Sequence, residues 1–422
     1  MDTLEPALVA LARESYRVDW HDSLECGEPL ACPYCLARFQ RARGLTLHYG
    51  RERQEGAFCP DCGSFRYLRL PDAAALEAKY EQPKAALTAA MGSYVIGIGG
   101  SLPATLDCLA GMAPEGRSGF ASILDVGCGF GLSLLACREA LRVPAVGLEP
   151  SPAAALGSAL LGLTIEQRYL ADYRAAAPGR FDLVSANGVV EHVGDPVDLV
   201  RQMWEASLTA ISFLVPSAEG LSPATPGPRL YGCLAPTSHL TMMSAEGARR
   251  LADRLRVPNV EICPRGELMV VWFSRAPLRP ASPDRLLDLT VDTALACLAS
   301  PVAEVRDGGL FRLLALCGQP RYAAWKALLQ AHAETLLESA APGILAGAAF
   351  DPAALPTFAY VGLFTGAVAA VGRGDAAGCP ARLRAARRCI RHLKRASPLM
   401  AAHAVVIEPN IESTIAHLEA AA

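Results

Sequence analysis

The chain has 422 residues, of which 52% are hydrophobic and 19% charged, and its formal net charge is −3. This composition supplies enough apolar material for buried cores, so it excludes a globally disordered protein and predicts roughly two to four domains. The small net charge excludes a protein that is drawn as a whole onto nucleic acid or an anionic membrane.

The first residues, MDTLEPALVALARESYRVDW, carry acidic side chains from position 2 onward and lack the basic and apolar regions of a signal peptide. Residues 1–25 are expected to form a short amphipathic helix and a connector. Fourteen cysteines, ten of them scattered outside two CxxC pairs, suit a reducing compartment, where thiols act as small apolar groups or metal ligands. We therefore expect a cytoplasmic protein.

Two CxxC pairs dominate residues 26–70, and their thiols are Cys32, Cys35, Cys59 and Cys62. Each CxxC turn places two thiolates close enough to share one metal ion, and two turns complete a tetrahedron. The pattern predicts a closed, structural zinc site with these four ligands. Cys26 and His48 are less favoured substitutes for one ligand, and a redox pair is the other interpretation.

The same segment is rich in arginine. Seven arginines stand against three acidic residues, which would suit an RNA or an anionic substrate, although a solvated basic surface is the favoured interpretation. The residues are Arg38, Arg41, Arg43, Arg51, Arg53, Arg66 and Arg69, opposed by Glu52, Glu55 and Asp61.

Residues 71–276 alternate between strand and helix patterns. Helices are expected at 131–142 and 195–208, and strands at 122–126, 144–150, 164–173, 181–188 and 210–217. Such alternation predicts βαβ units around a parallel sheet, which is a Rossmann-like α/β fold. The runs 260–266 and 268–274 are almost contiguous and should form an antiparallel hairpin.

The strongest chemical signal is the run LDVGCGFG, residues 124–131, between the first of these strands and its helix. Gly127, Gly129 and Gly131 leave room for a ligand that lies over the turn. Their spacing differs from the G-x-G-x-x-G of dinucleotide loops. A carboxylate at Asp125 would repel a pyrophosphate and suits a cationic ligand without phosphates.

Acidic residues also follow the next two predicted strands. Glu149 can accept both hydroxyls of a ribose, Asp172 can accept from an adenine amino group, and Tyr173 can stack on the adenine ring. The alternative is that these are surface acids in ordinary βα turns.

The runs LDVGCGFG, VGLEPS, LADY and FDLVSANGVVEHVGDP resemble the class I S-adenosylmethionine-dependent methyltransferases over about residues 80–276. The resemblance implies a seven-stranded sheet whose last strand is antiparallel. It also implies that the glycine loop, with Cys128 in it, approaches the amino acid part of the cofactor, and that Asn187 lies near the sulfonium. The cysteine segment resembles the zinc-ribbon-like module that precedes the catalytic domain in some bacterial methyltransferases.

Candidate catalytic residues follow the fourth predicted strand. Glu191 and His192 lie close to the expected position of the methyl group, and His239 belongs to a segment, 218–243, that is expected to cover the pocket. Either imidazole can act as a base, with capping or packing as the alternative role. Some ubiquinone-type O-methyltransferases hold a metal with E-x-x-E-H, but the first glutamate position is Gly188 here, so a catalytic metal is not expected.

The region after the Pro-rich stretch 276–284 reads as helix throughout. Its most apolar run, 358–371, has 14 residues and is too short to cross a bilayer, so a buried helix is expected. The basic residues between Arg382 and Arg395 predict a solvated helix face, with docking of an acidic partner or a polysaccharide as the alternative. The expected domains are therefore a helix and zinc ribbon at 1–70, a methyltransferase domain at 71–278 and a helical domain at 283–422.

These features predict methyl transfer from S-adenosylmethionine to an oxygen or carbon of a small-molecule or glycan-linked acceptor. One alternative is an RNA or protein methyltransferase that docks through the zinc ribbon. Another is a non-catalytic cofactor-binding scaffold that recruits a partner through its helical domain. A further glycine cluster at 95–100 is interpreted as a lid or connector.

Overall fold

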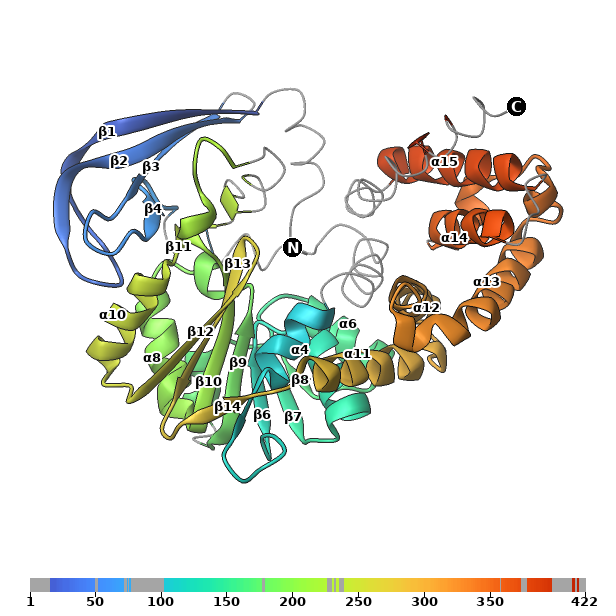
Figure 1. Cartoon of the computed structure of the whole chain (residues 1–422). Helices are drawn as coiled ribbons and strands as arrows, with labels where there is room; N and C mark the ends of the chain where they lie inside the picture. The colour runs from blue at the N-terminus through green and yellow to red at the C-terminus, as the bar shows by residue number, and fades with distance from the viewer. Residues whose placement is uncertain are drawn as a thin grey trace.

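A computed structural model describes residues 16–49, 52–71, 102–176, 179–225, 239–356, 358–372 and 378–396, with a few isolated positions between and beyond them (Figure 1). The expected N-terminal helix and the glycine cluster at 95–100 lie outside these described residues.

The centre of the molecule is a seven-stranded sheet with the strand order β12-β13-β10-β9-β6-β7-β8. The strands are β6 (Ile123–Val126), β7 (Ala145–Leu148), β8 (Ile165–Glu166), β9 (Phe181–Asn187), β10 (Ser207–Pro216), β12 (Asn259–Arg265) and β13 (Leu268–Ser274). β6 to β10 pair in parallel, whereas β13 is antiparallel to both β10 and β12. The predicted Rossmann-like sheet and its terminal hairpin are therefore confirmed.

Helices cover both faces of this sheet. Along β6, Leu124 and Val126 face a core shared with α8 and α10, whereas Ile123 faces a core shared with α4 and α5. This alternation is the period-two pattern of a strand buried on both faces. The helices are α4 (Leu102–Ala110), α5 (Leu132–Ala136) with its continuation η2 (Cys137–Leu141), α6 (Ala153–Leu161), α7 (Leu170–Ala176), α8 (Pro196–Ala206) and α10 (Ala245–Leu255).

The third predicted strand is largely wrong. Only Ile165 and Glu166 pair with β7, and the chain then enters α7 at Leu170. The apolar residues Leu170 and Tyr173 lie three positions apart and are buried together, which is the spacing of one helix face rather than of a strand.

The N-terminal module is a second sheet with the order β1-β2-β3-β4-β11, of which β1 to β4 are drawn in blue in Figure 1. Its strands are β1 (Tyr16–Ala31), β2 (Arg38–Tyr49), β3 (Glu52–Phe58), β4 (Phe65–Tyr67) and β11 (Thr241–Met242). The connector expected before residue 26 is therefore wrong, because this stretch belongs to a 16-residue strand. The fifth strand, β11, follows β10 in the chain and so belongs to the methyltransferase region. The N-terminal module and the methyltransferase region therefore share this sheet.

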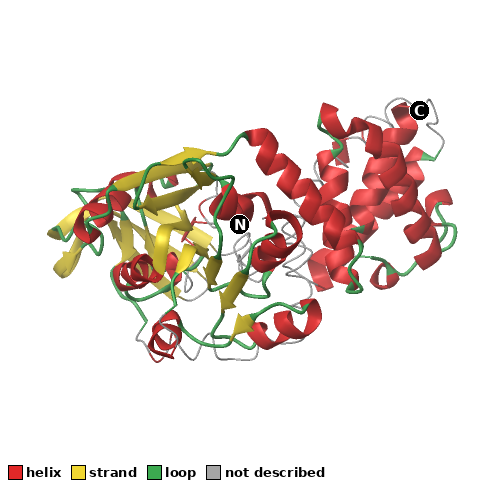
Figure 2. Ribbon diagram, turned by 90° about the horizontal axis from the view of Figure 1, so that it is seen from below, coloured by secondary structure: helices red, strands yellow, loops and turns green. Residues whose placement is uncertain are grey.

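The C-terminal part is helical, and Figure 2 shows it beside the strand-rich part. Its helices are α11 (Pro283–Leu298), α12 (Ala303–Leu316), α13 (Lys326–Ala340), α14 (Ala359–Gly372) and α15 (Cys379–Ala396), joined by the short turns η5 (Pro320–Trp325), η6 (Ile344–Ala346) and η7 (Pro352–Ala354). The expected buried helix at 358–371 is α14. Among the described residues, no helix is both long and apolar enough to cross a membrane.

The Pro-rich stretch at 276–284 is not a free linker. β14 (Leu278–Pro280) pairs with β5 (Met112–Pro114), and α11 buries Leu289 and Cys297 in the same core as α4. The backbone of this stretch and the first helix after it therefore both pack against the methyltransferase region.

Candidate functional site

The glycine loop connects β6 to α5 and takes a conformation that requires glycine. Gly127, Gly129 and Gly131 all have positive φ values, between 56° and 87°. A Cβ atom at Gly127 would lie 2.5 Å from a Val189 methyl group, whereas a Cβ at Gly129 would meet nothing. The loop is thus tightly packed below and open at Gly129, as expected where a ligand approaches the backbone.

Asp125 lies beneath the loop rather than on its surface. Its carboxylate is 2% exposed and accepts hydrogen bonds from the hydroxyls of Ser133 and Ser185. Burial raises the pKa of Asp125 to about 6. The hydrogen bonds from the two serines favour the charged form and oppose part of this rise. Its observed contacts therefore order the loop from inside.

Glu149, just past the tip of β7, lies beside the loop. Its Oε2 atom accepts from the Gly129 amide at 3.0 Å, and its Oε1 atom accepts from the Ser151 amide at 2.9 Å. A carboxylate held by two backbone amides is fixed in position at the carboxyl edge of the sheet, where open α/β folds bind ligands. Cys128 belongs to the same turn, and its sulfur packs over Gly147 of β7.

The structure places Asp172 and Tyr173 differently from the sequence prediction. Asp172 is exposed in the first turn of α7 and is not at a strand end. Tyr173 is buried, and its ring packs against Phe181 at a centroid distance of 6.4 Å. The Tyr173 ring is therefore used in the core, which argues against its predicted stacking on adenine.

Asn187 ends β9 at the same edge as the glycine loop. Its Nδ2 atom donates to the Thr105 hydroxyl of α4 at 2.9 Å. This bond fixes the amide on the strand that borders β6, where the resemblance places the sulfonium.

Glu191, His192 and His239 form one cluster beyond the end of β9, although His239 is 47 residues away from His192 in the chain. Their ligand-type atoms lie within 4.8 Å of one another, and the two imidazole rings meet edge to face with centroids 4.8 Å apart. Glu191 and His192 belong to η3 (Val190–His192). Complete burial raises the pKa of Glu191 to about 8. No local pattern in the sequence pairs these two segments.

Hydrogen bonds join this cluster to the N-terminal sheet. The Leu240 amide donates to the Glu191 carbonyl at 2.7 Å, and the Tyr67 amide of β4 donates to the Leu240 carbonyl at 3.3 Å. The Tyr34 hydroxyl is hydrogen-bonded to that of Thr241 at 2.8 Å. Residues 239–243 thus form a bridge between the cysteine module and the cluster, whereas the sequence predicted only a cover.

The four predicted cysteines converge at one point. Cys32 and Cys62 have sulfurs 3.6 Å apart, and Cys35 and Cys59 have sulfurs 3.4 Å apart. Bonds of about 2.3 Å to a central zinc would place tetrahedral sulfurs about 3.8 Å apart, so the donor set fits the ion. Cys26 and His48 are not part of this cluster.

The two CxxC turns have matching backbones. In the first turn, the Leu36 amide donates to the Cys32 carbonyl, and in the second the Gly63 amide donates to the Cys59 carbonyl. Leu36 and Gly63 both have positive φ values, 65° and 75°. This repeated turn directs both sulfurs of each pair towards the same centre.

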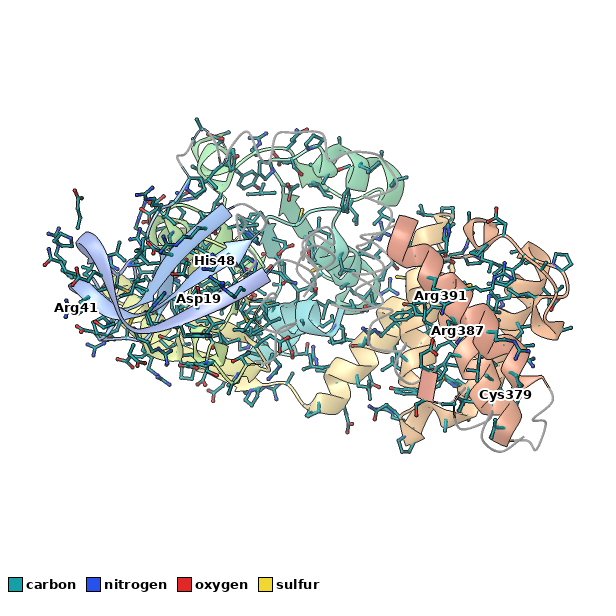
Figure 3. The ribbon with its side chains drawn as sticks, turned by 90° about the horizontal axis from the view of Figure 1, so that it is seen from above. Asp19, Arg41, His48, Cys379, Arg387 and Arg391 are labelled. Carbon is teal, nitrogen blue, oxygen red and sulfur yellow. The ribbon has the colours of Figure 1, made fainter. Side chains whose placement is uncertain are left out.

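Several of the basic residues of this module already have partners. Arg41 pairs with Glu25, Arg53 pairs with Glu55, and Arg66 donates to the Ala31 carbonyl. Figure 3 shows His48 and Asp19 on neighbouring strands, and their side chains are hydrogen-bonded at 2.8 Å. Because these basic side chains already have partners within the chain, an ordinary solvated surface is favoured over an RNA-binding face.

The basic helix α15 also uses part of its charge within the chain. Arg382 pairs with Glu334, Arg387 pairs with Glu412, and Arg388 lies over the Phe350 ring. Figure 3 labels Arg387 and Arg391 along the same helix.

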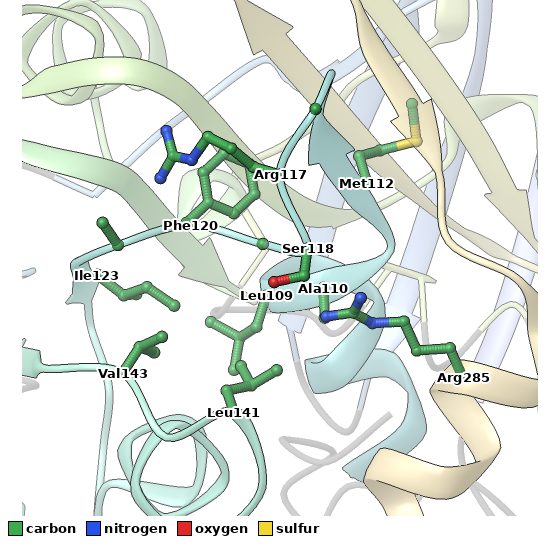
Figure 4. A pocket seen from close by; sticks show the side chains of 13 residues that line it. Leu109, Ala110, Met112, Arg117, Ser118, Phe120, Ile123, Leu141, Val143 and Arg285 are labelled. Atoms are coloured by element: carbon green, nitrogen blue, oxygen red, sulfur yellow. The ribbon is translucent and has the colours of Figure 1, made fainter.

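A cavity of about 440 Å³ lies at the opposite edge of the sheet (Figure 4). Phe120 and Ile123, at the beginning of β6, line it together with Arg285 of α11. Ligands in open α/β sheets bind at the carboxyl ends of the strands, so this cavity is separate from the candidate site.

Comparison with known proteins agrees with this arrangement. Residues 98–255 match the family model of a methyltransferase domain. The chain is 36% identical over 85 residues to the ubiquinone biosynthesis O-methyltransferase of Sodalis glossinidius (strain morsitans), which covers 19% of this chain and 34% of that protein. It is 38% identical over 86 residues to the same enzyme of Xanthomonas euvesicatoria pv. vesicatoria (strain 85-10), covering 19% and 36%. The chain thus spans about a third of the length of these relatives.

Solved structures with detectable likeness include an O-methyltransferase family protein from Burkholderia thailandensis, at 15% identity and a TM-score of 0.37, which covers 47% of this chain and 63% of that one. Another is an S-adenosylmethionine-dependent methyltransferase from Archaeoglobus fulgidus, at 14% identity and a TM-score of 0.33, which covers 42% and 93%.

The sheet order, the glycine loop and the matched family model together define a methyltransferase domain. This domain spans the matched residues 98–255.

Proposed function

We propose that the chain transfers the methyl group of S-adenosylmethionine to an oxygen or carbon of a small-molecule or glycan-linked acceptor. The observation that carries this proposal is the position of Glu149, which two backbone amides hold beside the open face of Gly129. In the proposed complex, Glu149 accepts the ribose hydroxyls, Gly127 to Gly131 face the amino acid part of the cofactor, and Asn187 lies near the sulfonium.

The acceptor is proposed to bind beside Glu191, His192 and His239. The positive sulfur already makes the methyl group electrophilic, so the protein has to position the acceptor, exclude water and receive a proton. His239 is 4% exposed and His192 is half-buried, which gives both rings a site that is shielded from bulk solvent. Asp172 remains a candidate for the adenine amino group from its place in α7.

Zinc is the proposed occupant of the cysteine cluster. Its role is structural, because four protein ligands leave no open position on the ion. The acceptor class is supported by partial sequence likeness to two enzymes of ubiquinone biosynthesis, and by arginines in the N-terminal module that are paired within the chain.

Calorimetry tests the cofactor directly. Titration of the full chain with S-adenosylhomocysteine should release or absorb heat with one-site stoichiometry, whereas NAD should give none. Replacing Glu149 by Gln should weaken S-adenosylhomocysteine binding by about tenfold or more, since a carboxylate hydrogen bond is worth roughly 1.5–3 kcal/mol. Glu261→Gln, an exposed change on β12, is the matched control. Binding of NAD in place of S-adenosylhomocysteine would contradict the proposal.

A second experiment identifies the acceptor class. The purified chain and methyl-labelled cofactor are incubated with a cell lysate, which is then separated into metabolite, RNA and protein fractions. Label in the metabolite fraction supports the proposal. Label in RNA or protein would favour docking through the cysteine module, and cofactor binding without any labelled fraction would favour a non-catalytic scaffold.

A further inference from the structure

We propose that Glu191, His192 and His239 form a binding site for one divalent transition-metal ion, separate from the cysteine cluster. The sequence argued against a metal here, because Gly188 replaces the first glutamate of the E-x-x-E-H pattern. The structure supplies a third ligand from another segment, since His239 lies beside the other two residues.

The three side chains have suitable spacing for a common ion. The His192 Nε2 and Glu191 Oε1 atoms are 3.9 Å apart, and all three ligand-type atoms lie within 4.8 Å of one another. Ligands bonded at about 2.1 Å to one ion are roughly 3 to 4 Å apart, so small side-chain rotations close the site.

An unpaired carboxylate oxygen provides an independent reason to expect a ligand. The Glu191 side chain is 4% exposed, and its Oε2 atom is buried without a hydrogen-bond partner. A buried, unsatisfied carboxylate oxygen is costly, and a bound cation would satisfy it.

The surroundings also orient the ligands. The His239 Nδ1 atom donates to the Cys233 carbonyl at 2.7 Å, which in the neutral ring leaves the lone pair on Nε2. Metal-bound histidines are commonly oriented by such a bond from the other ring nitrogen. The Leu240 amide donates to the Glu191 carbonyl, so the segments that carry the two buried ligands are joined beside the site.

The donor set indicates the class of ion. Two imidazoles and one carboxylate suit Fe²⁺, Mn²⁺ or Zn²⁺, and they leave open coordination positions, unlike the four thiols. If the proposed methyl transfer is correct, an oxygen of the acceptor would fill an open position. The ion would lower the pKa of that hydroxyl, its proton would pass to water, and the new O–CH₃ bond would form as the S–CH₃ bond breaks.

Manganese distinguishes this site from the cysteines, because thiolates favour softer ions. The full chain is loaded with one equivalent of Zn²⁺, which the four thiolates take first, and is then titrated with Mn²⁺, and free Mn²⁺ is followed by electron paramagnetic resonance. We expect one Mn²⁺ to bind per chain, and both E191Q and H239A to weaken binding by more than about tenfold. The matched controls are E261Q on β12 and H332A on α13, both exposed, which should bind Mn²⁺ like the wild type.

Each outcome has a defined meaning. Failure of the wild type to bind Mn²⁺, or equal binding by E191Q and H239A, would overturn the site. Should either variant fail to fold, nitrogen hyperfine couplings from two imidazoles on wild-type-bound Mn²⁺ decide the question, and their absence counts against the site. Calorimetry with S-adenosylhomocysteine in the same samples reports the cofactor site separately, so loss of one proposal is distinguishable from loss of the other.

Discussion

Gly129 is the residue at which the loop geometry makes its sharpest prediction. Gly129 and Gly162 both have positive φ values, and a Cβ atom would meet nothing within 4 Å at either position. Alanine at either site should therefore cost about 1 kcal/mol of backbone strain. Only Gly129→Ala should also weaken S-adenosylhomocysteine binding, by about tenfold or more in calorimetry, because its new methyl group would occupy space above the loop. Equal binding by both variants would contradict a ligand over Gly129.

Asp125 predicts a pH dependence of stability. Its pKa is about 6 in the folded chain against 3.8 for an ordinary aspartate, so the folded state holds the proton more tightly. The contribution of this group is therefore fully present below about pH 4 and is lost as the pH rises through 6, by about 3 kcal/mol in total. Relative to wild type, Asp125→Asn should gain stability over this window in urea denaturation.

The exposed change Asp253→Asn serves as the control for this effect. A constant stability difference between Asp125→Asn and wild type from pH 4 to pH 7 would show that the buried carboxyl keeps an ordinary pKa.

At the level of single residues, the sequence identified the loop and the cysteines because both are local patterns with a fixed chemistry. It did not indicate that Tyr173 is buried beside Phe181, because a tyrosine beside an acid fits a ligand contact or a core position equally well. It did not join His239 to Glu191, because only the folded chain brings these two residues, 48 positions apart, together.

Among the elements, β11 makes the most specific prediction. Its residues pair with β4, and the Ser244 hydroxyl donates to the carbonyl of Cys62. Cys62→Ser should therefore loosen residues 239–243 as well as the N-terminal module, and hydrogen exchange of the Leu240 amide should rise by at least about tenfold. Cys263→Ser, a half-exposed thiol on β12, is the control. Unchanged exchange at 239–243 would mean that the bridge is stable without the cysteine cluster.

Element boundaries were predictable where strong punctuation was present. Asp195 caps α8 by accepting from the amides of Val197 and Asp198, as its position before a proline indicated. The end of the third predicted strand was not predictable. β8 has only two residues, too few to show a strand period, and the apolar residues that suggested a longer strand belong to α7. β11 is also two residues long, and its pairing depends on a partner strand more than 170 residues earlier.

For the whole molecule, α11 tests whether the helical part stabilises the methyltransferase part. Leu289 is 8% exposed and packs in the core that contains Trp272, whereas Leu295 on the same helix is 42% exposed. Leu289→Ala should lower the free energy of unfolding by about 2–4 kcal/mol, followed by fluorescence in urea. Leu295→Ala should change it by less than about 0.5 kcal/mol. Similar values for both variants would contradict the shared core.

The overall fold class was predictable because alternating strands and helices admit few sheet topologies. The contact between the helical part and the methyltransferase part was not predictable. Composition marks the Pro-rich stretch at 276–284 as a linker, whereas its backbone pairs with β5.

The pairing of β4 with β11 limits how this chain can be divided or recombined. A protein engineer who exchanged residues 16–71 for another metal-binding cassette would remove the partner strand of Thr241 and Met242 along with the cysteines. Replacement of the module therefore also requires replacement of residues 239–244 by the matching segment of the donor protein. Residues 16–71 and 239–244 should accordingly be inherited together.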